Sequence, residues 1–540
     1  MAVSLGPNLI EDGLVLSLDA GDINSVMGAT VEVLVVAGGG GGGMDMGGGG
    51  GGGGVIYNSS YAVTQGTAVT VTVGNGGYGA PAGNTYRGDG AGPQSNAHQF
   101  TISATQGGNS VFGSLTAIGG GFGASSYYGY TPNSGVGGTG GSGGGCSGYT
   151  HGGERYVDGT NGSTANNVSG QGYPGGNSGD PTTATDNHYS GGGGGAGGRG
   201  TSGPNHVGPN GIRGNGGQGV LYSTMSPYYF AGGGGGSGYS GDGGNGGIGG
   251  GGGGSASNGN IGSAGAGGIN VGSSGSAGSN APGGNAGANT GSGGGGGSHY
   301  NSNNKGGDGG SGIVIVRYSG PQKATGGTIS TVAGYTLHTF TSSGTFTPNS
   351  IWYDTSPNGN NGTFGASTAA PTYSSQNGGS FVFDGINDKL STNFKPSGER
   401  SYFIWVKFSS LTHSSGYQLT GTQETNSYTY IGIQNGGDVY YYAGASTGGN
   451  IGNPVTVNTW VNLGFALFPD GSRRVYKNGI EIHYNTGGLG GTATLEFSVG
   501  CINQNHFITG NIAQVFVYNR ALSASEVSQN YNSMKSRFGL

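Results

Sequence analysis

Charged side chains are scarce in this sequence. Asp, Glu, Lys and Arg make up 7% of the 540 residues, whereas an average protein carries about a quarter. The net charge of −6 is too small for self-repulsion to keep the chain unfolded. With 17 Lys and Arg against 23 Asp and Glu, and no basic run, nucleic acid is excluded as an expected partner.

Cysteine and long apolar runs are equally scarce. The two cysteines, Cys146 and Cys501, lie in regions of different composition, so we expect two unpaired thiols and no disulfide framework. No apolar run reaches the roughly 18 residues that a bilayer-spanning helix needs, so membrane insertion is not expected.

The amino-terminal stretch MAVSLGPNLIEDGLVLSLDAG does not read as a secretory signal. It lacks a basic start, and Pro7, Glu11 and Asp12 break its apolar character. A surface-type composition without an export signal is typical of proteins released by cell lysis, as phage particles are. We therefore expect synthesis in a host cytoplasm and display on a virion surface.

Glycine is what this sequence has in excess, with 138 residues. Residues 38–312 are glycine-rich throughout and contain pure runs of five to eight glycines, such as Gly47–Gly54. Three interpretations stay open: a packed lattice of polyglycine-II helices, a flexible linker, or another glycine-rich β structure. A structureless insertion of this length would be unusual, which favours the lattice.

A polyglycine-II helix has three residues per turn and no internal hydrogen bonds, so its N–H and C=O groups must find partners in neighbouring helices. Glycine permits this close approach because it has no Cβ. The strand-forming segments VEVLVV and IVIVRY bracket the module and are expected to pair, which would bring its ends together. Aromatic interruptions, including Tyr128 and Tyr130, then form contact surfaces on loops or pack as caps against the lattice.

Strand-like segments return from residue 313 onward, and in the last 190 residues short β runs with Asn-Gly and Asp-Gly turns predict an all-β sandwich. The best helix candidate is ALSASEVSQNYNSM near the carboxyl end, where Ser523 and Glu526 form a capping-box pattern.

Two resemblances sharpen this interpretation. VEVLVVAGGGGGG, SGIVIVRY and GYTLHTFTSSGTFT resemble the glycine-rich domains of bacteriophage tail-fibre and adhesin proteins. In that family HTFTSSGTFT usually comes first, whereas here it comes last. The order is therefore circularly permuted, which implies that the three segments are neighbours in one small sheet.

The second resemblance covers nearly all of residues 351–535. WYDTSPNGNNGTF, GGSFVFDGINDKL, FIWVKF and GNIAQVFVYNRALSASEV are similar to the concanavalin A-like, laminin-G type sandwich, a jelly roll. In that family a strand like GLVLSLDA closely precedes the first motif, but here it lies more than 300 residues earlier. We therefore predict residues 1–25 as the first sandwich strands, 26–348 as an inserted glycine-rich domain with a closing sheet, and 349–540 as the remainder of the sandwich.

The resemblance implies a glycan site, sometimes with Ca²⁺. Asp384 and Asp388 offer two carboxylates for calcium, although the cluster alone supplies too few oxygens, and turn formation by these side chains is the alternative. No other cofactor is expected. Candidate ligand-binding residues are Asp438, Tyr440, Tyr442, Asn503, Asn505 and His506, together with Tyr128 and Tyr130.

No catalytic motif occurs in a plausible context, so we expect a protein that is not an enzyme. The predicted function is a tail-fibre or receptor-binding component that contacts other virion proteins and a host-surface glycan, as a homo-oligomer. The alternatives are a structural head-fibre, decoration or fibre subunit, and, third, a glycan hydrolase.

Overall fold

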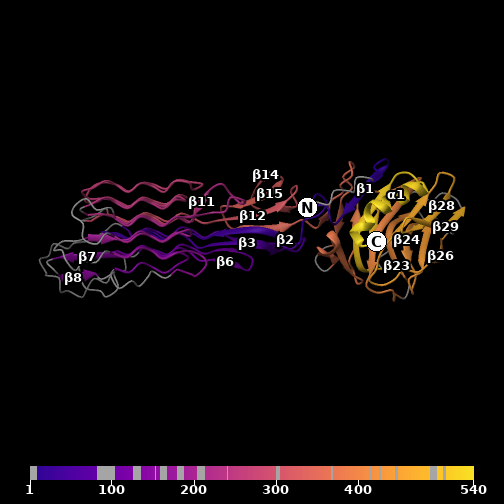
Figure 1. Cartoon of the computed structure of the whole chain (residues 1–540), viewed down its shortest axis with the longest axis horizontal. Helices are drawn as coiled ribbons and strands as arrows, with labels where there is room; N and C mark the ends of the chain where they lie inside the picture. Colours follow the sequence, from indigo (N-terminus) through magenta and orange to yellow (C-terminus); the bar gives the residue numbers. More distant parts are fainter. Residues whose placement is uncertain are drawn as a thin grey trace.

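The computed structural model describes residues 9–81, 104–125, 135–151, 154–157, 167–178, 188–203, 213–239, 241–299, 304–365, 369–413, 416–424, 427–443, 448–486, 496–502 and 506–540. The molecule is elongated, with a rod at one end and a β-sandwich at the other (Figure 1). It is nearly all β. No helix in the described ranges is long and apolar enough to cross a bilayer.

The sandwich consists of two eight-stranded sheets, and its jelly-roll character agrees with the predicted fold class. The first sheet contains β1 (Leu14–Asp19), β19 (Thr372–Ser374), β20 (Ser380–Asp384), β22 (Arg400–Phe408), β27 (Trp460–Leu467), β28 (Ser472–Lys477), β29 (Ile480–Thr486) and β31 (Thr509–Tyr518). The second runs in the order β17 (Ile351–Trp352), β18 (Gly362–Phe364), β21 (Leu390–Thr392), β30 (Ser498–Val499), β23 (Tyr417–Glu424), β24 (Ser427–Ile433), β25 (Val439–Ala443) and β26 (Gly448–Gly452).

The main core lies between these sheets. It is built from inward-facing side chains of both, including Leu16, Trp352, Phe381, Ile404 and Ile431. The outer face of the first sheet carries a second apolar cluster, which α1 (Ala524–Met534) and η3 (Lys535–Phe538) cover. A short helix, η2 (Gln376–Gly378), precedes β20. The predicted capping box at Ser523 and Glu526 is confirmed.

Strand β1 joins the sandwich although more than 300 residues separate it from the next sandwich strand. It pairs antiparallel with residues 514–518 of β31. On the same edge of β31, β20 pairs with residues 509–512. Two hydrogen bonds join β1 and the residues after it to the segment that follows β17. The Tyr353 N–H donates to the Ser25 carbonyl at 2.7 Å, and the Ser17 N–H donates to Asp354 Oδ1 at 2.8 Å. The exact domain boundaries at Ser25 and Asn349 stay a prediction.

Two five-stranded sheets form the base of the rod. The first has the order β14 (Thr328–Val332), β15 (Tyr335–Phe340), β12 (Ile313–Ser319), β2 (Thr30–Val36) and β3 (Val55–Ala62). The second has the order β13 (Ala324–Thr325), β16 (Gly344–Pro348), β4 (Val69–Thr72), β5 (Ser110–Phe112) and β6 (Leu115–Ala117). The remaining described strands of the rod are β7 (Ser147–His151), β8 (Glu154–Val157), β9 (His188–Ser190), β10 (Val220–Leu221) and β11 (Tyr229–Phe230).

The predicted pairing of VEVLVV with IVIVRY is confirmed, because β2 and β12 are antiparallel partners. Both faces of this pair are buried. Val33 and Val316 face the second five-stranded sheet of the rod, whereas Leu34 and Ile315 belong to an apolar cluster that contains Phe230. This double burial explains why the two segments are continuous apolar runs.

The prediction that HTFTSSGTFT joins the same sheet is only half right. Its first half, β15, pairs with β12, but its second half, β16, pairs with β4 in the other sheet. The polar turn between β15 and β16 carries the chain from one sheet to the other.

Beyond the two sheets, glycine segments run side by side along the rod (Figure 1). Segment Gly47–Gly54 shows how these segments are hydrogen-bonded, because every third N–H donates to the same neighbouring segment. Gly48 and Gly51 donate to Ala124 and Gly121 (2.8 and 2.7 Å), Gly49 and Gly52 to Gly191 and Gly194 (3.1 and 2.8 Å), and Gly50 and Gly53 to Gly294 and Gly291 (2.8 and 2.7 Å). This three-residue period is that of a polyglycine-II helix.

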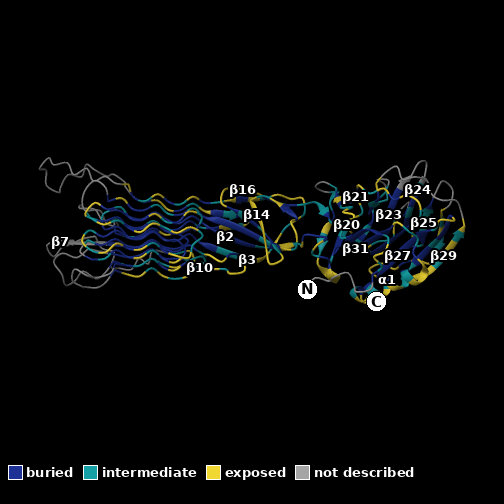
Figure 2. Ribbon diagram, turned by 90° about the horizontal axis from the view of Figure 1, so that it is seen from above, coloured by how far each residue is buried: buried dark blue, intermediate teal, exposed yellow. Residues whose placement is uncertain are grey.

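The carbonyl groups of the same segment accept from three further segments. The donors are Gly40 and Gly43, Ser142 and Gly145, and Gly234 and Ser237. One helix therefore has six neighbours, three as acceptors and three as donors, and its backbone is satisfied without a hydrophobic core. Figure 2 shows the result, with inner segments buried and outer ones partly exposed.

Candidate functional site

Four tyrosines gather on the outward face of the second sheet of the sandwich. On β24 and β25, Thr429, Ile431, Val439 and Tyr441 point into the core. Because side chains alternate along a strand, the intervening residues point outward and stay partly exposed. We call this set the tyrosine platform: Tyr428, Tyr430, Tyr440 and Tyr442.

The four rings form one cluster, in which Tyr430 contacts each of the other three. Tyr430 and Tyr442 stack with centroids 5.8 Å apart and 8° between their planes. Tyr440 lies 6.1 Å from Tyr430, and Tyr428 lies 6.4 Å from both Tyr430 and Tyr442. Such distances are within the range of favourable aromatic pairs, so the platform is a preformed surface.

Register places glycines beside the central pair. Gly421 on β23 lies opposite Tyr430, and Gly448 on β26 lies opposite Tyr442. A Cβ at Gly421 would come within 2.6 Å of the Tyr430 Cβ, and one at Gly448 within 2.7 Å of the Tyr442 Cδ2. The glycines therefore leave room for the rings to lie over the neighbouring strands.

The hydroxyls of Tyr430 and Tyr440 are neutral at ordinary pH. Burial and the neighbouring tyrosines raise the pKa of Tyr430 to about 12, and burial also raises the pKa of Tyr440. These two hydroxyls can therefore both donate and accept hydrogen bonds. Asp438 directly precedes β25, and its Oδ2 accepts a hydrogen bond from Asn450 Nδ2 on β26 at 3.1 Å. An aromatic surface edged by polar groups can stack on a sugar ring and bond its hydroxyls.

The structure brings some predicted ligand residues together and separates others. Tyr440 and Tyr442 belong to the platform, and Asp438 lies beside it through Asn450, the register partner of Tyr440. His506 lies at the start of β23 instead, with its ring 5.8 Å from that of His413 and Nδ1 3.1 Å from the Gly416 carbonyl. Asn503, Asn505, Tyr128 and Tyr130 lie outside the described residues.

Sequence reasoning missed Tyr428 and Tyr430. Their signal was present, because SYTYIGI alternates tyrosine with core residues in the same way as VYYYA. Two adjacent strands with this alternation place their tyrosines on one face.

The carboxylates predicted for calcium stabilise a turn. Asp384 Oδ1 accepts from the Ile386 N–H at 2.8 Å, and Asp388 Oδ2 accepts from the Asp384 N–H at 2.8 Å. Burial raises the pKa of Asp388 to about 6. In the described part of the chain, no third acidic, histidine or cysteine side chain joins them to form a metal cluster. The contacts favour the turn, and calcium binding stays a prediction.

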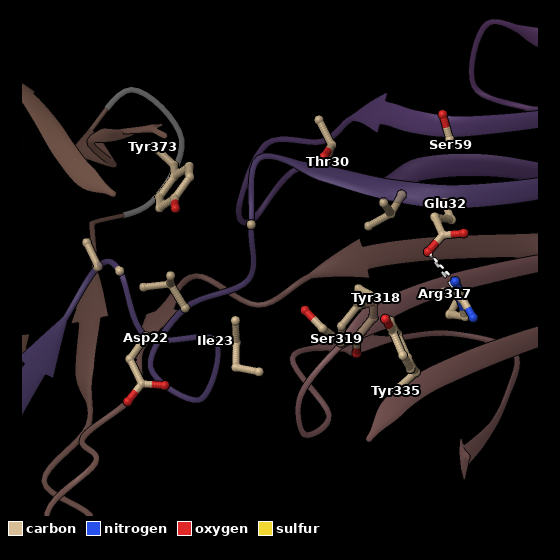
Figure 3. Close-up of a pocket in the computed structure, with 15 residues that line it drawn as sticks. Asp22, Ile23, Thr30, Glu32, Ser59, Arg317, Tyr318, Ser319, Tyr335 and Tyr373 are labelled. Atoms are coloured by element: carbon tan, nitrogen blue, oxygen red, sulfur yellow. Dashed lines mark hydrogen bonds and ion pairs between the residues drawn. The ribbon is translucent and has the colours of Figure 1, made fainter. Parts of the chain in front are cut away.

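A cleft of about 260 Å³ lies where the rod meets the sandwich (Figure 3). Arg317 lines it but is already engaged, because Nη2 lies 2.5 Å from Glu32 Oε1 and its guanidinium lies 4.2 Å from the Tyr335 ring. Beside the cleft, buried Lys323 donates through Nζ to the Ile23 carbonyl. With these charges engaged within the chain, we interpret the cleft as a joint between the two parts.

Comparison with known proteins supports the fold of the sandwich. Residues 384–528 match the family model of the concanavalin A-like lectin/glucanases superfamily. The sandwich is a concanavalin A-like domain. No curated protein matches the chain.

Similar solved structures cover about a third of this chain. They include domain 4 of AbnA, an extracellular arabinanase from Geobacillus stearothermophilus in complex with arabinotriose (20% identity, 33% of this chain and 92% of that one, TM-score 0.29). The receptor-binding domain of botulinum neurotoxin type G is 14% identical over 33% of this chain and 48% of its own length, with a TM-score of 0.28. A Trypanosoma rangeli sialidase is 14% identical over 34% of this chain and 30% of its own length, with a TM-score of 0.27.

Proposed function

We propose that this protein is an attachment protein that binds glycans through the tyrosine platform of its concanavalin A-like domain. The platform carries the proposal, because stacked, partly exposed aromatic rings that carry phenolic hydroxyls suit the apolar faces and hydroxyl edges of sugars. The proposed activity is binding and not catalysis.

We further propose that the protein is displayed on a bacteriophage particle, in a tail fibre or another receptor-binding component. The motifs shared with glycine-rich tail-fibre proteins support this placement. The rod suits it physically, because a laterally bonded lattice is stiff and would hold the platform away from its anchor. Partners would then be other virion proteins and a host-surface glycan.

The test is a glycan microarray probed with the purified full chain and with its Tyr430→Ala/Tyr442→Ala variant. We expect wild-type binding to a subset of glycans and loss of that binding in the variant. In a second arm, excess wild-type protein should block phage adsorption to host cells, and the variant should not. Binding to no glycan, or equal binding by both proteins, would overturn the proposal.

A structural role without a receptor is the second candidate, favoured by the size of the self-contained glycine lattice. A head-fibre, decoration or fibre subunit would leave adsorption unaffected at any excess. A fall in polysaccharide viscosity during incubation would instead indicate a glycan hydrolase.

A further inference from the structure

The tyrosine platform is one end of a longer row of outward-facing residues. Antiparallel register links the positions of this row directly, from strand to strand across the second sheet. From β25 to β18 the members are Tyr442, Tyr430, Gly421, Ser498, Ser391 and Thr363. The row therefore runs perpendicular to the strands and continues well beyond the four rings.

Burial confirms that these positions face outward. Leu390 and Thr392 flank Ser391 and are buried, and Val499 follows Ser498 and is fully buried. Ser391 and Ser498 are partly exposed, and Thr363 is exposed between two buried residues. The hydroxyl half of the row is thus open on the same face as the rings.

The row changes chemistry at its centre. On one side of Gly421 are two stacked rings, and on the other are three hydroxyl side chains. Because Gly421 has no side chain, no side chain at this position of the row separates the rings from the hydroxyl groups. Six strands at the usual spacing of about 4.8 Å give the row a length of about 24 Å, far more than one sugar ring needs.

We propose that this row binds a linear neutral polysaccharide lying across the strands, with several consecutive sugar units engaged at once. The inference rests on the proposed glycan-binding function and names its ligand class. Sugars at the ring end would stack on Tyr430 and Tyr442. Units further along would place their hydroxyl groups against Ser498, Ser391 and Thr363.

Charge favours a neutral polymer over an acidic one. The six positions of the row hold no Asp, Glu, Lys, Arg or His. At the platform end there is an acidic side chain, Asp438, whose Oδ2 is 3.1 Å from Asn450 Nδ2 beside Tyr440. A uronic acid or sialic acid would therefore meet a carboxylate and gain no cation from the row.

The test compares binding of short and long oligosaccharides to the full chain. The probes are cello-, malto-, manno-, xylo- and arabino-oligosaccharides of two to six units with their parent polymers, measured by isothermal titration calorimetry and affinity electrophoresis. We expect at least one series in which the hexasaccharide binds roughly tenfold or more tightly than the disaccharide, a difference of about 1.4 kcal/mol.

The diagnostic variant is Ser391→Glu, which adds bulk and charge at the hydroxyl end without touching the rings. We expect it to reduce hexasaccharide affinity to the level of the short oligosaccharides and to leave short-oligosaccharide binding unchanged. Thr372→Glu, at an exposed position of edge strand β19 in the other sheet, is the matched control and should bind as wild type. Equal melting temperatures of the two variants would show that both fold.

The two levels of proposal fail differently. If no probe binds, or if Tyr430→Ala/Tyr442→Ala binds as wild type, glycan binding at the platform is wrong. If a disaccharide binds as tightly as its hexasaccharide, or if Ser391→Glu leaves the hexasaccharide affinity intact, the platform binds a single terminal sugar and the extended row is wrong.

Discussion

Tyr430 and Tyr442 lie directly opposite each other on neighbouring strands, and only 8° separates the planes of their rings. Each ring therefore holds the other in a fixed orientation before any ligand arrives. A preorganised surface loses little conformational entropy on binding. Replacing either ring should thus weaken binding by removing its own contact and by releasing its neighbour.

For this reason we expect Tyr430→Ala to reduce affinity for a bound glycan by roughly tenfold or more, as measured by titration calorimetry. Tyr484→Ala is the control, because Tyr484 is 51% exposed on β29 of the other sheet. Equal losses in the two variants would show that the platform is not the binding surface.

The glycine lattice predicts an unusual sensitivity to alanine. A Cβ on Gly50 would overlap the Gly40 carbonyl oxygen and lie 2.9 Å from that of Gly41. Because both obstacles are backbone atoms, Gly50→Ala should lower the free energy of unfolding by about 3 kcal/mol or more. Denaturant titration would measure this loss.

Gly198→Ala provides the matched control within the same module. Its Cβ would come no closer than 3.7 Å to any atom outside the adjacent residues, an ordinary van der Waals contact. We expect stability within about 0.5 kcal/mol of wild type. If Gly50→Ala is as stable as Gly198→Ala, the close packing around Gly50 does not hold in solution.

Asp388 predicts a pH dependence of stability. Burial raises its pKa from 3.8 to about 6, so between these values the folded protein binds a proton that the unfolded chain has released. Stability should fall by at most about 3 kcal/mol as pH rises through this window. Urea titrations should show this component in wild type and not in Asp388→Asn.

The same residue tests the calcium prediction. A bound Ca²⁺ would favour the ionised carboxylate and would raise the melting temperature at neutral pH. We expect no rise with millimolar Ca²⁺ if Asp384 and Asp388 serve only the turn. A rise in wild type that disappears in Asp388→Asn would show that this turn binds calcium.

Lys323 predicts the opposite pH trend at the joint. Burial lowers the pKa of this amine from 10.5 to about 8, so above pH 8 the unfolded chain binds a proton that the folded protein lacks. The contribution of Lys323 to stability should therefore rise between about pH 8 and pH 9, a range in which an ordinary tyrosine is still mostly protonated. Urea titrations of Lys323→Met should lack this rise, and its presence there would assign the effect to another group.

The two cysteines report separately on the two parts of the molecule. Cys146 lies in the rod and Cys501 in the sandwich, and both are buried and outside any disulfide. Burial also raises the pKa of the Cys146 thiol. We expect neither to react with a thiol reagent until its part unfolds, and Cys→Ser variants would assign each reaction. Rapid labelling of either in native buffer would contradict its burial.

Much of the fold was predictable because side chains encode it. The apolar runs of β2 and β12, the Ser523–Glu526 cap and the alternation in the sandwich strands each carry a local signal. A further signal was missed, because KGGDGGSG (residues 305–312) repeats every third residue, the period of the lattice.

The arrangement of the glycine segments could not be predicted in the same way. Residues of Gly47–Gly54 bond to six other segments, yet one glycine run is chemically identical to another. No side chain specifies which run lies beside which, so the turns and closing sheets must fix the order. The platform was half predicted for a related reason, since Tyr440 and Tyr442 were identified without the neighbouring strand that completes it.

The lattice also has a thermal consequence. Its inner segments are stabilised by backbone hydrogen bonds, and unfolding them exposes mostly polar surface. Polar exposure lowers the heat capacity of unfolding, whereas apolar exposure raises it. The stability curve of the rod should therefore be flatter than that of the sandwich, so cold should weaken the rod less than the domain it carries.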